Sequence, residues 1–357
     1  MTSDLGIYIH IPFCVKKCNY CDFLSFSSDR IKNSFEDEND IHKRYIEALK
    51  KEALDYSKKV EGRYIKTIYI GGGTPSILDE YLISDLLEFL QDSFNIRDDA
   101  EITIECNPKT TNYKKLKKYY DSGINRLSLG LQSTNNELLK KLGRIHTYEE
   151  FLTQYDEALN AGFTNINVDL MSALPGESID DYIKDLRNVI NLKTKHISSY
   201  GLIIEENTPF YSNENILKNL PSEEEAIRMY ELTNEYLENA GYNRYEISNY
   251  SVKGYESKHN QSYWTLDEYI GLGLYASSYL DNKRYKVHKD LAAYMENDYH
   301  KIEVEELSVN DSMEEFMFLG LRMMKGVSYN DFYEKFNCSI DDVYHTAISK
   351  NIKLNNL

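Results

Sequence analysis

Short apolar runs alternate with amphipathic stretches over the first two thirds of the chain. Six runs rich in β-branched and aromatic residues predict strands, over residues 6–11, 64–70, 101–105, 126–131, 165–170 and 196–204. The stretches between them place apolar residues at helical spacing and predict helices, over residues 41–59, 79–94, 112–121, 135–142, 148–160, 180–191 and 221–241. This alternation predicts an α/β fold of parallel βαβ units, either an open sheet or a barrel-like array with its helices outside.

The alternation weakens after Gly241. Residues 245–250 and 285–287 are predicted as short strands, and His259 to Trp264 is predicted as a polar loop. A mainly helical region begins at Leu291, with helices near residues 313–324, 329–336 and 340–349. We therefore expect a core over residues 1–242, a connecting segment over 243–290 and a helical C-terminal domain over 291–357.

Composition narrows the class of protein. The 357 residues, 41% of them hydrophobic, are enough for one large domain with an accessory domain. No apolar stretch reaches the roughly 20 residues of a membrane span, and the start of the chain shows no signal peptide. The net charge of −17 argues against nucleic acid as a partner, because such binding needs a basic face. Five cysteines, three of them clustered, are not a disulfide framework and indicate a reduced, cytoplasmic setting.

The cluster of three thiols is the main chemical signal. Cys14, Cys18 and Cys21 follow the first predicted strand and lie close enough in sequence to share one ligand. A structural zinc site normally has four protein ligands, and an electron-transfer cubane normally has four cysteines. Three thiolates leave one iron of a [4Fe-4S] cluster open, which is the interpretation we favour. Zinc with a distant fourth ligand, such as Cys106, Cys338 or a histidine, and three unrelated buried cysteines are the alternatives.

Polar groups also follow the other predicted strands. Gly71 to Thr74 come after the second strand, and the next three strands end at or near a polar residue: Glu105, Gln132 and Asp169. Ligands of parallel α/β folds bind at the carboxyl ends of the strands, so these groups are expected to share one face. Glycines there allow close approach of the backbone, although the motif lacks the lysine and spacing of a phosphate-binding P-loop. Arg144 is a candidate partner for a carboxylate. Taken singly, each of these residues is more often a helix cap or a solvated charge.

The motifs together resemble a known family. The Cys-x3-Cys-x2-Cys spacing, preceded by Tyr8-Ile-His-Ile-Pro-Phe and joined by Gly72-Gly-Thr-Pro75, is similar to radical S-adenosylmethionine enzymes. The similarity is to the branch that contains oxygen-independent coproporphyrinogen III oxidases and heme chaperones. It implies an incomplete (β/α)6 barrel of the TIM type with a mainly helical C-terminal domain, a [4Fe-4S] cluster on the three cysteines and S-adenosylmethionine on the open iron. The positions that match family contacts to this cofactor, some of them serving a second molecule in the oxidases, are Tyr8, Gly72, Gly73, Thr74, Glu105, Gln132, Arg144 and Asp169.

Two features favour the chaperones of this branch over the oxidases. The oxidase pattern has a further cysteine where this chain has Phe23, and the chaperone pattern has the His-Asn-x-x-Tyr-Trp motif found at His259 to Trp264. In that motif, His259 would bind heme iron while Tyr263 and Trp264 pack on the macrocycle. The resemblance implies a protein that carries heme to apo-hemoproteins such as respiratory cytochromes, without porphyrinogen decarboxylation. A porphyrinogen oxidase and a zinc-binding scaffold remain the alternatives.

The resemblance also implies partners for the protein. The sequence departs from the family pattern at two places. The resemblance implies heme, apo-hemoprotein acceptors and an electron donor as partners, and it is compatible with a homodimer and with membrane association through a partner. The family's Pro-Gly-Ala-His segment reads here as Leu274 to Ser277, so its histidine is replaced by Ser277. The C-terminal domain is also expected to be shorter than is usual in the family.

Overall fold

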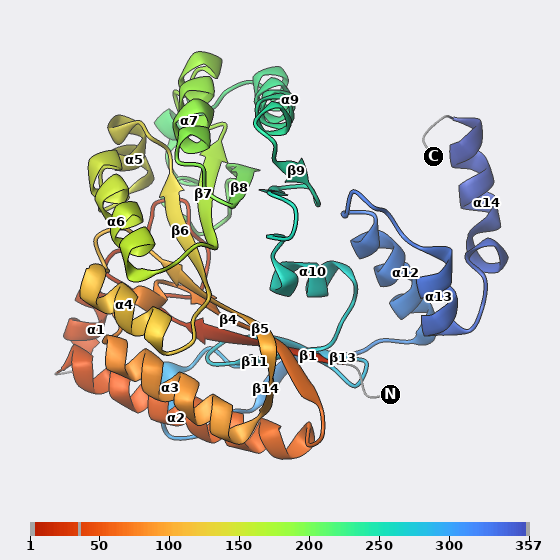
Figure 1. Ribbon diagram of the computed structural model, residues 1–357, viewed down its shortest axis with the longest axis horizontal. Coiled ribbons are helices and arrows are strands. Elements are labelled where there is room, and N and C mark those ends of the chain that lie inside the picture. The colour runs from red at the N-terminus through yellow and green to blue at the C-terminus, as the bar shows by residue number, and fades with distance from the viewer. Residues whose placement is uncertain (1–3, 35–36, 355–357) are drawn as a thin grey trace.

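Six parallel strands form the centre of the structure, a computed structural model that describes residues 4–34 and 37–354. They lie side by side in sequence order and curve into an open barrel (Figure 1). The strands are β1 (Leu5–Ile11), β4 (Tyr64–Gly72), β5 (Asn95–Cys106), β6 (Arg126–Gln132), β7 (Ile166–Ser172) and β8 (His196–Gly201). β1 and β8 each pair with a later strand rather than with each other, so the barrel is incomplete. The predicted (β/α)6 fold class is confirmed.

Helices that connect the strands cover the outside of the barrel. Neighbouring helices pack on one another in nearly the same order as the strands: α2 (Glu38–Lys59), α3 (Glu80–Ser93), α4 (Tyr113–Asp121), α6 (Tyr148–Ala161), α7 (Ile179–Asn191) and α9 (Glu223–Asn239). Short elements occupy the loops: β2 (Phe13–Cys14), β3 (Phe26–Ser27), α1 (Ser28–Ser34), a 3₁₀ turn (Pro75–Ile77), α5 (Asn136–Leu142) and α8 (Glu214–Lys218). This arrangement places every strand-to-helix loop at the carboxyl end of the barrel.

The alternation of side chains along each strand separates the core from the barrel interior. In β1, Ile7, Ile9 and Ile11 are fully buried among the residues of the main hydrophobic cluster. Burying such a side chain contributes about 1.5–3 kcal/mol. The alternate positions are polar in most of the strands, as in β6, where Arg126 and Ser128 line an internal cavity. The interior of this barrel is therefore largely polar, unlike the packed apolar layers of an ordinary TIM barrel.

Shorter strands extend the sheet beyond both ends of the barrel. β8 pairs with β10 (Asn249–Ser251), which pairs with β9 (Asn243–Arg244). On the other side, β1 pairs in parallel with the first of four further strands: β11 (Tyr269–Leu272), β12 (Ser277–Leu280), β13 (Lys283–Val287) and β14 (Lys301–Glu306). β14 is a strand within the region that is expected to be mainly helical, and its alternating Lys-Ile-Glu-Val-Glu-Glu sequence pairs along the edge of β13. Between β13 and β14 the structure has one helix, α11 (Leu291–Met295).

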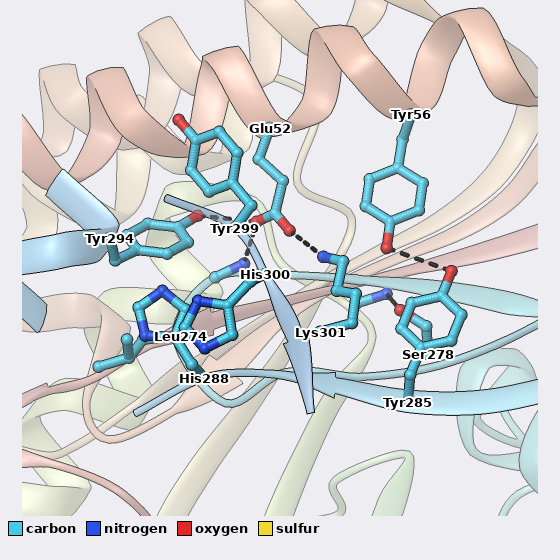
Figure 2. Close-up of polar contacts among 12 residues, drawn as sticks. Glu52, Tyr56, Leu274, Ser278, Tyr285, His288, Tyr294, Tyr299, His300 and Lys301 are labelled. Atoms are coloured by element: carbon cyan, nitrogen blue, oxygen red, sulfur yellow. Dashed lines mark hydrogen bonds and ion pairs between the residues drawn. The ribbon is translucent and has the colours of Figure 1, made fainter. Parts of the chain in front are cut away.

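A buried glutamate joins this extension to the barrel (Figure 2). Glu52 of α2 accepts hydrogen bonds from the Gly273 amide, the Tyr294 hydroxyl and the Lys301 ammonium, each at 2.8 Å. Gly273 has a φ of +104°, and a side chain there would collide with the His10 carbonyl. The contacts fix the turn between β11 and β12 against α2. They place Ser277, the position where the resemblance leads one to expect a histidine, at the start of β12 and outside the barrel cavity.

Three helices complete the described chain: α12 (Val309–Gly320), α13 (Tyr329–Phe336) and α14 (Ile340–Lys353). They enclose a separate apolar cluster that includes Phe316, Phe332 and Ile340. In Figure 1 they stand beside the barrel next to α10 (Lys258–Trp264). None of the helices in residues 4–34 and 37–354 is long and apolar enough to cross a membrane.

Candidate functional site

The three clustered thiols lie in one loop at the carboxyl end of β1. The loop is held closed by a hydrogen bond from the Lys17 ammonium to the Phe23 carbonyl, 2.9 Å long. Its middle is anchored to the end of α5 by the amide and side chain of Asn19, which donate to the carbonyls of Leu142 and Lys141. The loop therefore has a fixed shape, and Cys14, Cys18 and Cys21 all line the cavity at the mouth of the barrel.

The glycine-rich loop after β4 packs directly on the first cysteine. The Gly73 amide donates to the Ile11 carbonyl and the Thr74 amide donates to the Phe13 carbonyl, at 2.9 and 2.7 Å. A side chain at position 73 would lie 2.7 Å from the Phe13 carbonyl, so only glycine fits. Both amides therefore bind carbonyl groups within the protein. The glycines bring the loop close to Cys14, whose sulfur accepts a hydrogen bond from the Thr74 hydroxyl at 3.5 Å.

A cavity of about 400 Å³ runs from the thiol loop into the barrel. Of the cofactor positions expected from the sequence, seven line it: Gly72, Gly73, Thr74, Glu105, Gln132, Arg144 and Asp169. The expectation that the strand ends share one face is therefore met by the geometry. Tyr8 differs, because it does not line the cavity. Its hydroxyl lies 3.0 Å from Nδ1 of His10, and its ring stacks on Tyr69, which does line the cavity.

Two carboxyl groups face this cavity, from β5 and β7 on either side of β6. Burial raises the pKa of Glu105 to about 7, against the opposing effect of hydrogen bonds from the Tyr69 hydroxyl and the Gly72 amide. Burial also raises the pKa of Asp169, although Asn167, Ser198 and Ser128 donate to it. A nearby cation would stabilise the charged form of each of these buried carboxyl groups. They suit the amine, hydroxyl and sulfonium groups of S-adenosylmethionine.

Arg144 links the cavity wall to the thiol loop. Its Nη2 donates to the Gly130 carbonyl and the Asn107 side chain at 2.5 and 2.6 Å, and its Nη1 lies 3.6 Å from the sulfur of Cys18. Hydrogen bonds to a ligating sulfur stabilise a more negatively charged iron–sulfur cluster. In this structure the Arg144 side chain is held by protein atoms and does not present a fully free guanidinium to a carboxylate.

The two metal centres that the sequence leaves open need different spacings of the three sulfur atoms. A single zinc ion with Zn–S bonds of about 2.3 Å brings its sulfur ligands to roughly 3.8 Å from each other. The three sulfurs do not all lie within 4.8 Å of one another; in the described chain only His288, Asp298 and His300 form such a trio. A [4Fe-4S] cluster places each thiolate on a different iron and needs the wider spacing. The residues thus fit the cluster better than a single zinc ion.

Burial affects the thiols themselves. It raises the pKa of Cys14, and it raises the pKa of Cys21 to about 11. Without a metal these groups are therefore neutral thiols, and coordination to a cation is what deprotonates them. The cluster, when bound, would supply one-electron chemistry and an open iron for the amino-acid end of S-adenosylmethionine.

The His-Asn-x-x-Tyr-Trp motif forms helix α10, which corrects its expected placement in a polar loop. The helix is short and polar, and its amino end is stabilised from a distance, because Glu101 of β5 accepts hydrogen bonds from the amides of Lys258 and His259 at 3.0 Å. His259 is 1% exposed. Its Nδ1 lies 2.8 Å from the Thr67 hydroxyl and its Nε2 lies 2.8 Å from the Tyr263 hydroxyl.

Helix α10 separates the barrel cavity from a second cavity. Asn260 lines the first, whereas Tyr263 and Trp264 line the second, which has a volume of about 350 Å³. The second cavity lies between α10, β11 to β13 and α12, with aromatic walls and the Arg284–Glu315 ion pair. Burial lowers the pKa of His259 to about 3, so the imidazole is neutral. Both of its nitrogens are occupied in this conformation.

Several residues that line the first cavity were not singled out from the sequence: Tyr20, Tyr69, Asn107, Arg126, Ser128, Asn167, Ser198, Tyr200 and Asn260. Most lie two residues apart along β6, β7 and β8, on the face opposite the buried aliphatic residues. The signal that identifies them is the regular alternation of polar residues within strands whose other face is fully apolar. A strand buried on both faces of an ordinary barrel would instead read as continuously apolar.

The barrel with a three-thiol loop at its carboxyl end defines a class of protein. A family model described as the radical SAM superfamily matches residues 8–189, and one described as the HemN C-terminal domain matches residues 307–355. The fold is also that of a solved structure, coproporphyrinogen III oxidase (HemN) from Escherichia coli. The two share a TM-score of 0.85 with 22% identity, over 99% of this chain and 83% of that one.

Similar sequences define the family of this chain more narrowly. It is 39% identical to the heme chaperone HemW of Lactococcus lactis, over 96% of this chain and 88% of the relative. It is 36% identical to HemW of Bacillus subtilis, over 96% of this chain and 89% of the relative. HemW of Escherichia coli is 39% identical over 75% of this chain and 68% of its own length. The chain therefore belongs to the HemW family within the radical SAM superfamily.

Proposed function

We propose that this protein is a cytoplasmic heme chaperone that carries a [4Fe-4S] cluster on Cys14, Cys18 and Cys21 and binds S-adenosylmethionine beside it. The observation that carries the proposal is the likeness to a heme chaperone over 96% of the chain. The thiol spacing and the strand-end carboxyls support the two cofactors. Apo-hemoproteins would be the acceptors and a one-electron donor would serve the cluster, while a homodimer and membrane association through a partner are compatible with this role.

Phe23 supports chaperone function over porphyrinogen oxidation. It stands where the oxidases have a further cysteine, and its side chain is 62% exposed at the mouth of the barrel cavity. The test is anaerobic reconstitution with iron and sulfide, followed by heme binding and porphyrinogen turnover in parallel. We expect heme binding without turnover of coproporphyrinogen III. Turnover with S-adenosylmethionine and a reductant would establish the oxidase instead, and stoichiometric zinc without sulfide would exclude the cluster.

We further propose that heme binds at α10, with His259 as the iron ligand and Tyr263 and Trp264 against the macrocycle. In the conformation described, Nε2 of His259 faces the Tyr263 hydroxyl, so ligation requires Tyr263 to turn away. The neutral imidazole supports this role, because a metal-binding histidine must be unprotonated.

A pair of variants tests the heme ligand. His259→Ala is expected to lose the Soret change seen on heme titration, whereas Tyr263→Phe removes only the competing hydroxyl and is expected to keep or strengthen heme binding. An unchanged spectrum and affinity in His259→Ala would exclude His259 as the ligand.

A further inference from the structure

Arg126 is a charged side chain enclosed in the floor of the barrel. It stands at the start of β6, is 1% exposed and lines the first cavity. Its Nε atom is buried without a hydrogen-bond partner. Among residues 4–34 and 37–354, no carboxylate lies within 4.0 Å of its guanidinium nitrogens and no hydrogen bond to them is found.

The acidic groups of the cavity are already engaged elsewhere. Glu105 accepts hydrogen bonds from the Tyr69 hydroxyl and the Gly72 amide. Asp169 accepts from the Asn167 side chain at 2.7 Å and from the Ser128 hydroxyl at 3.4 Å. Both feel the charge of Arg126, which acts to lower their pKa values, but neither forms an ion pair with it.

Glu101, two residues before the register partner of Arg126 on β5, accepts hydrogen bonds from the amides of Lys258 and His259 instead. The ring of His196 lies between the Asn167 carbonyl oxygen and the Tyr245 hydroxyl, at 2.6 and 2.8 Å. The pKa of His196 is held well below its usual value by burial and by the charge of Arg126, so the imidazole is neutral. Burial and the charges of Lys66 and Arg126 lower the pKa of His259, on α10, so this imidazole is also neutral. The polar groups at the floor of the barrel thus form hydrogen bonds with one another and not with the Arg126 guanidinium.

A buried charge without a partner costs several kcal/mol of folding free energy. A barrel that fills its interior with apolar side chains avoids this cost, as most TIM barrels do. Here the unpaired cation faces a cavity deep enough for a ligand, and guanidinium groups bind carboxylates through two parallel hydrogen bonds.

We propose that Arg126 binds a carboxylate group of a ligand that reaches the floor of the barrel. The identity of the ligand rests on the proposed function, which offers a propionate of heme as the source of this group. Arg126 is then a binding residue for that ligand, and its counter-charge arrives only with the ligand.

The test compares heme with heme dimethyl ester, which lacks free carboxylates, in the wild type and in Arg126→Met. Affinities are measured on the full-length, anaerobically reconstituted protein. We expect Arg126→Met to weaken heme binding by about tenfold or more, as for a lost charged hydrogen bond, and to leave binding of the dimethyl ester unchanged.

Equal effects on heme and its dimethyl ester, or no effect on either, would overturn the inference while leaving the proposed function intact. A wild type that does not bind heme would contradict the proposed function itself. Arg126→Lys keeps the charge and is expected to retain part of the discrimination, which keeps the test informative if Arg126→Met folds poorly.

A matched control and a stability measurement separate binding from structure. Arg228→Met removes an exposed arginine of α9 that pairs with Glu231 and is expected to change no affinity. Without ligand, Arg126→Met is expected to melt no lower than the wild type, because it removes an uncompensated charge. A marked loss of Tm in ligand-free Arg126→Met and Arg126→Lys alike would show a structural role and overturn the inference.

Discussion

Glu101 is expected to hold helix α10 in place. Its carboxylate is 6% exposed and accepts hydrogen bonds from the amides of Lys258 and His259 and from the Ser257 hydroxyl. These are the first donors of α10, which has only seven residues and cannot be stable by itself. The change to test is Glu101→Ala.

The expected loss of stability in Glu101→Ala follows from the groups that lose their hydrogen-bond acceptor. Two buried amides lose their acceptor, at about 1–3 kcal/mol each. The negative charge at the amino end of the helix is also lost, at about 0.3–1 kcal/mol. Together we expect Glu101→Ala to reduce the free energy of unfolding by about 2–7 kcal/mol. Glu101→Gln keeps one acceptor oxygen and is expected to cost about 1–2 kcal/mol.

Urea unfolding measures the global effect, and hydrogen exchange measures the local one. Exchange of the amides of Lys258 and His259 is expected to become fast in Glu101→Ala while β5 itself stays protected. Asp99→Ala is the matched control, because Asp99 lies on the same strand and its exposed carboxylate is only 3.8 Å from the Lys258 ammonium. If Glu101→Ala costs less than about 1 kcal/mol, or no more than Asp99→Ala, the reasoning about α10 is refuted.

Three further predictions follow from the site and its surroundings. Cys18→Ser is expected to lower iron and sulfide incorporation on reconstitution, and full incorporation would contradict the assignment of Cys18 as a ligand. Phe23→Cys changes an exposed side chain, so we expect it to alter stability by no more than about 0.5 kcal/mol and to create no porphyrinogen turnover; an increase in turnover would show that this residue alone separates the two activities. Burial raises the pKa of Glu177 from 4.5 to about 8. Folded wild type therefore holds a proton that the unfolded chain releases, and its stability falls between these pH values by up to about 1.4 kcal/mol per pH unit. The Tm of Glu177→Gln minus that of the wild type is expected to increase from pH 5 to pH 8, and a constant difference would contradict the raised pKa.

The sequence predicts the central strands and their polar ends because both signals are local. An apolar run such as residues 126–131 is a strand in any α/β arrangement, and the carboxyl ends of parallel strands have to meet. Helix α10 escaped prediction because its stabilising acceptor, Glu101, lies 157 residues away from Lys258. The strands β11 to β14 are short and pair with neighbours that local periodicity does not reveal.

The orientation of charged side chains was harder still to predict. Arg126 begins a predicted strand, where an arginine is usually solvated, and only the closure of the barrel shows that it points inward. The nitrogens of His259, which the resemblance predicts as ligands of heme iron, are a similar case. The sequence shows a histidine next to aromatic residues, but Thr67, which occupies one of its nitrogens, comes from another strand. Tertiary contacts of this kind decide which groups of a motif are available to a ligand.

The position of α10 as a common wall has a thermodynamic consequence. Asn260 borders the barrel cavity, and Tyr263 and Trp264 border the cavity beneath α12. A ligand that shifts the helix while occupying one cavity changes the affinity of the other, and thermodynamic linkage requires the effect to be reciprocal. If heme alters the binding of S-adenosylmethionine by some factor, then S-adenosylmethionine alters the binding of heme by the same factor. Loading and release of cargo would then be controlled by cofactor occupancy, with no bond made or broken in either ligand.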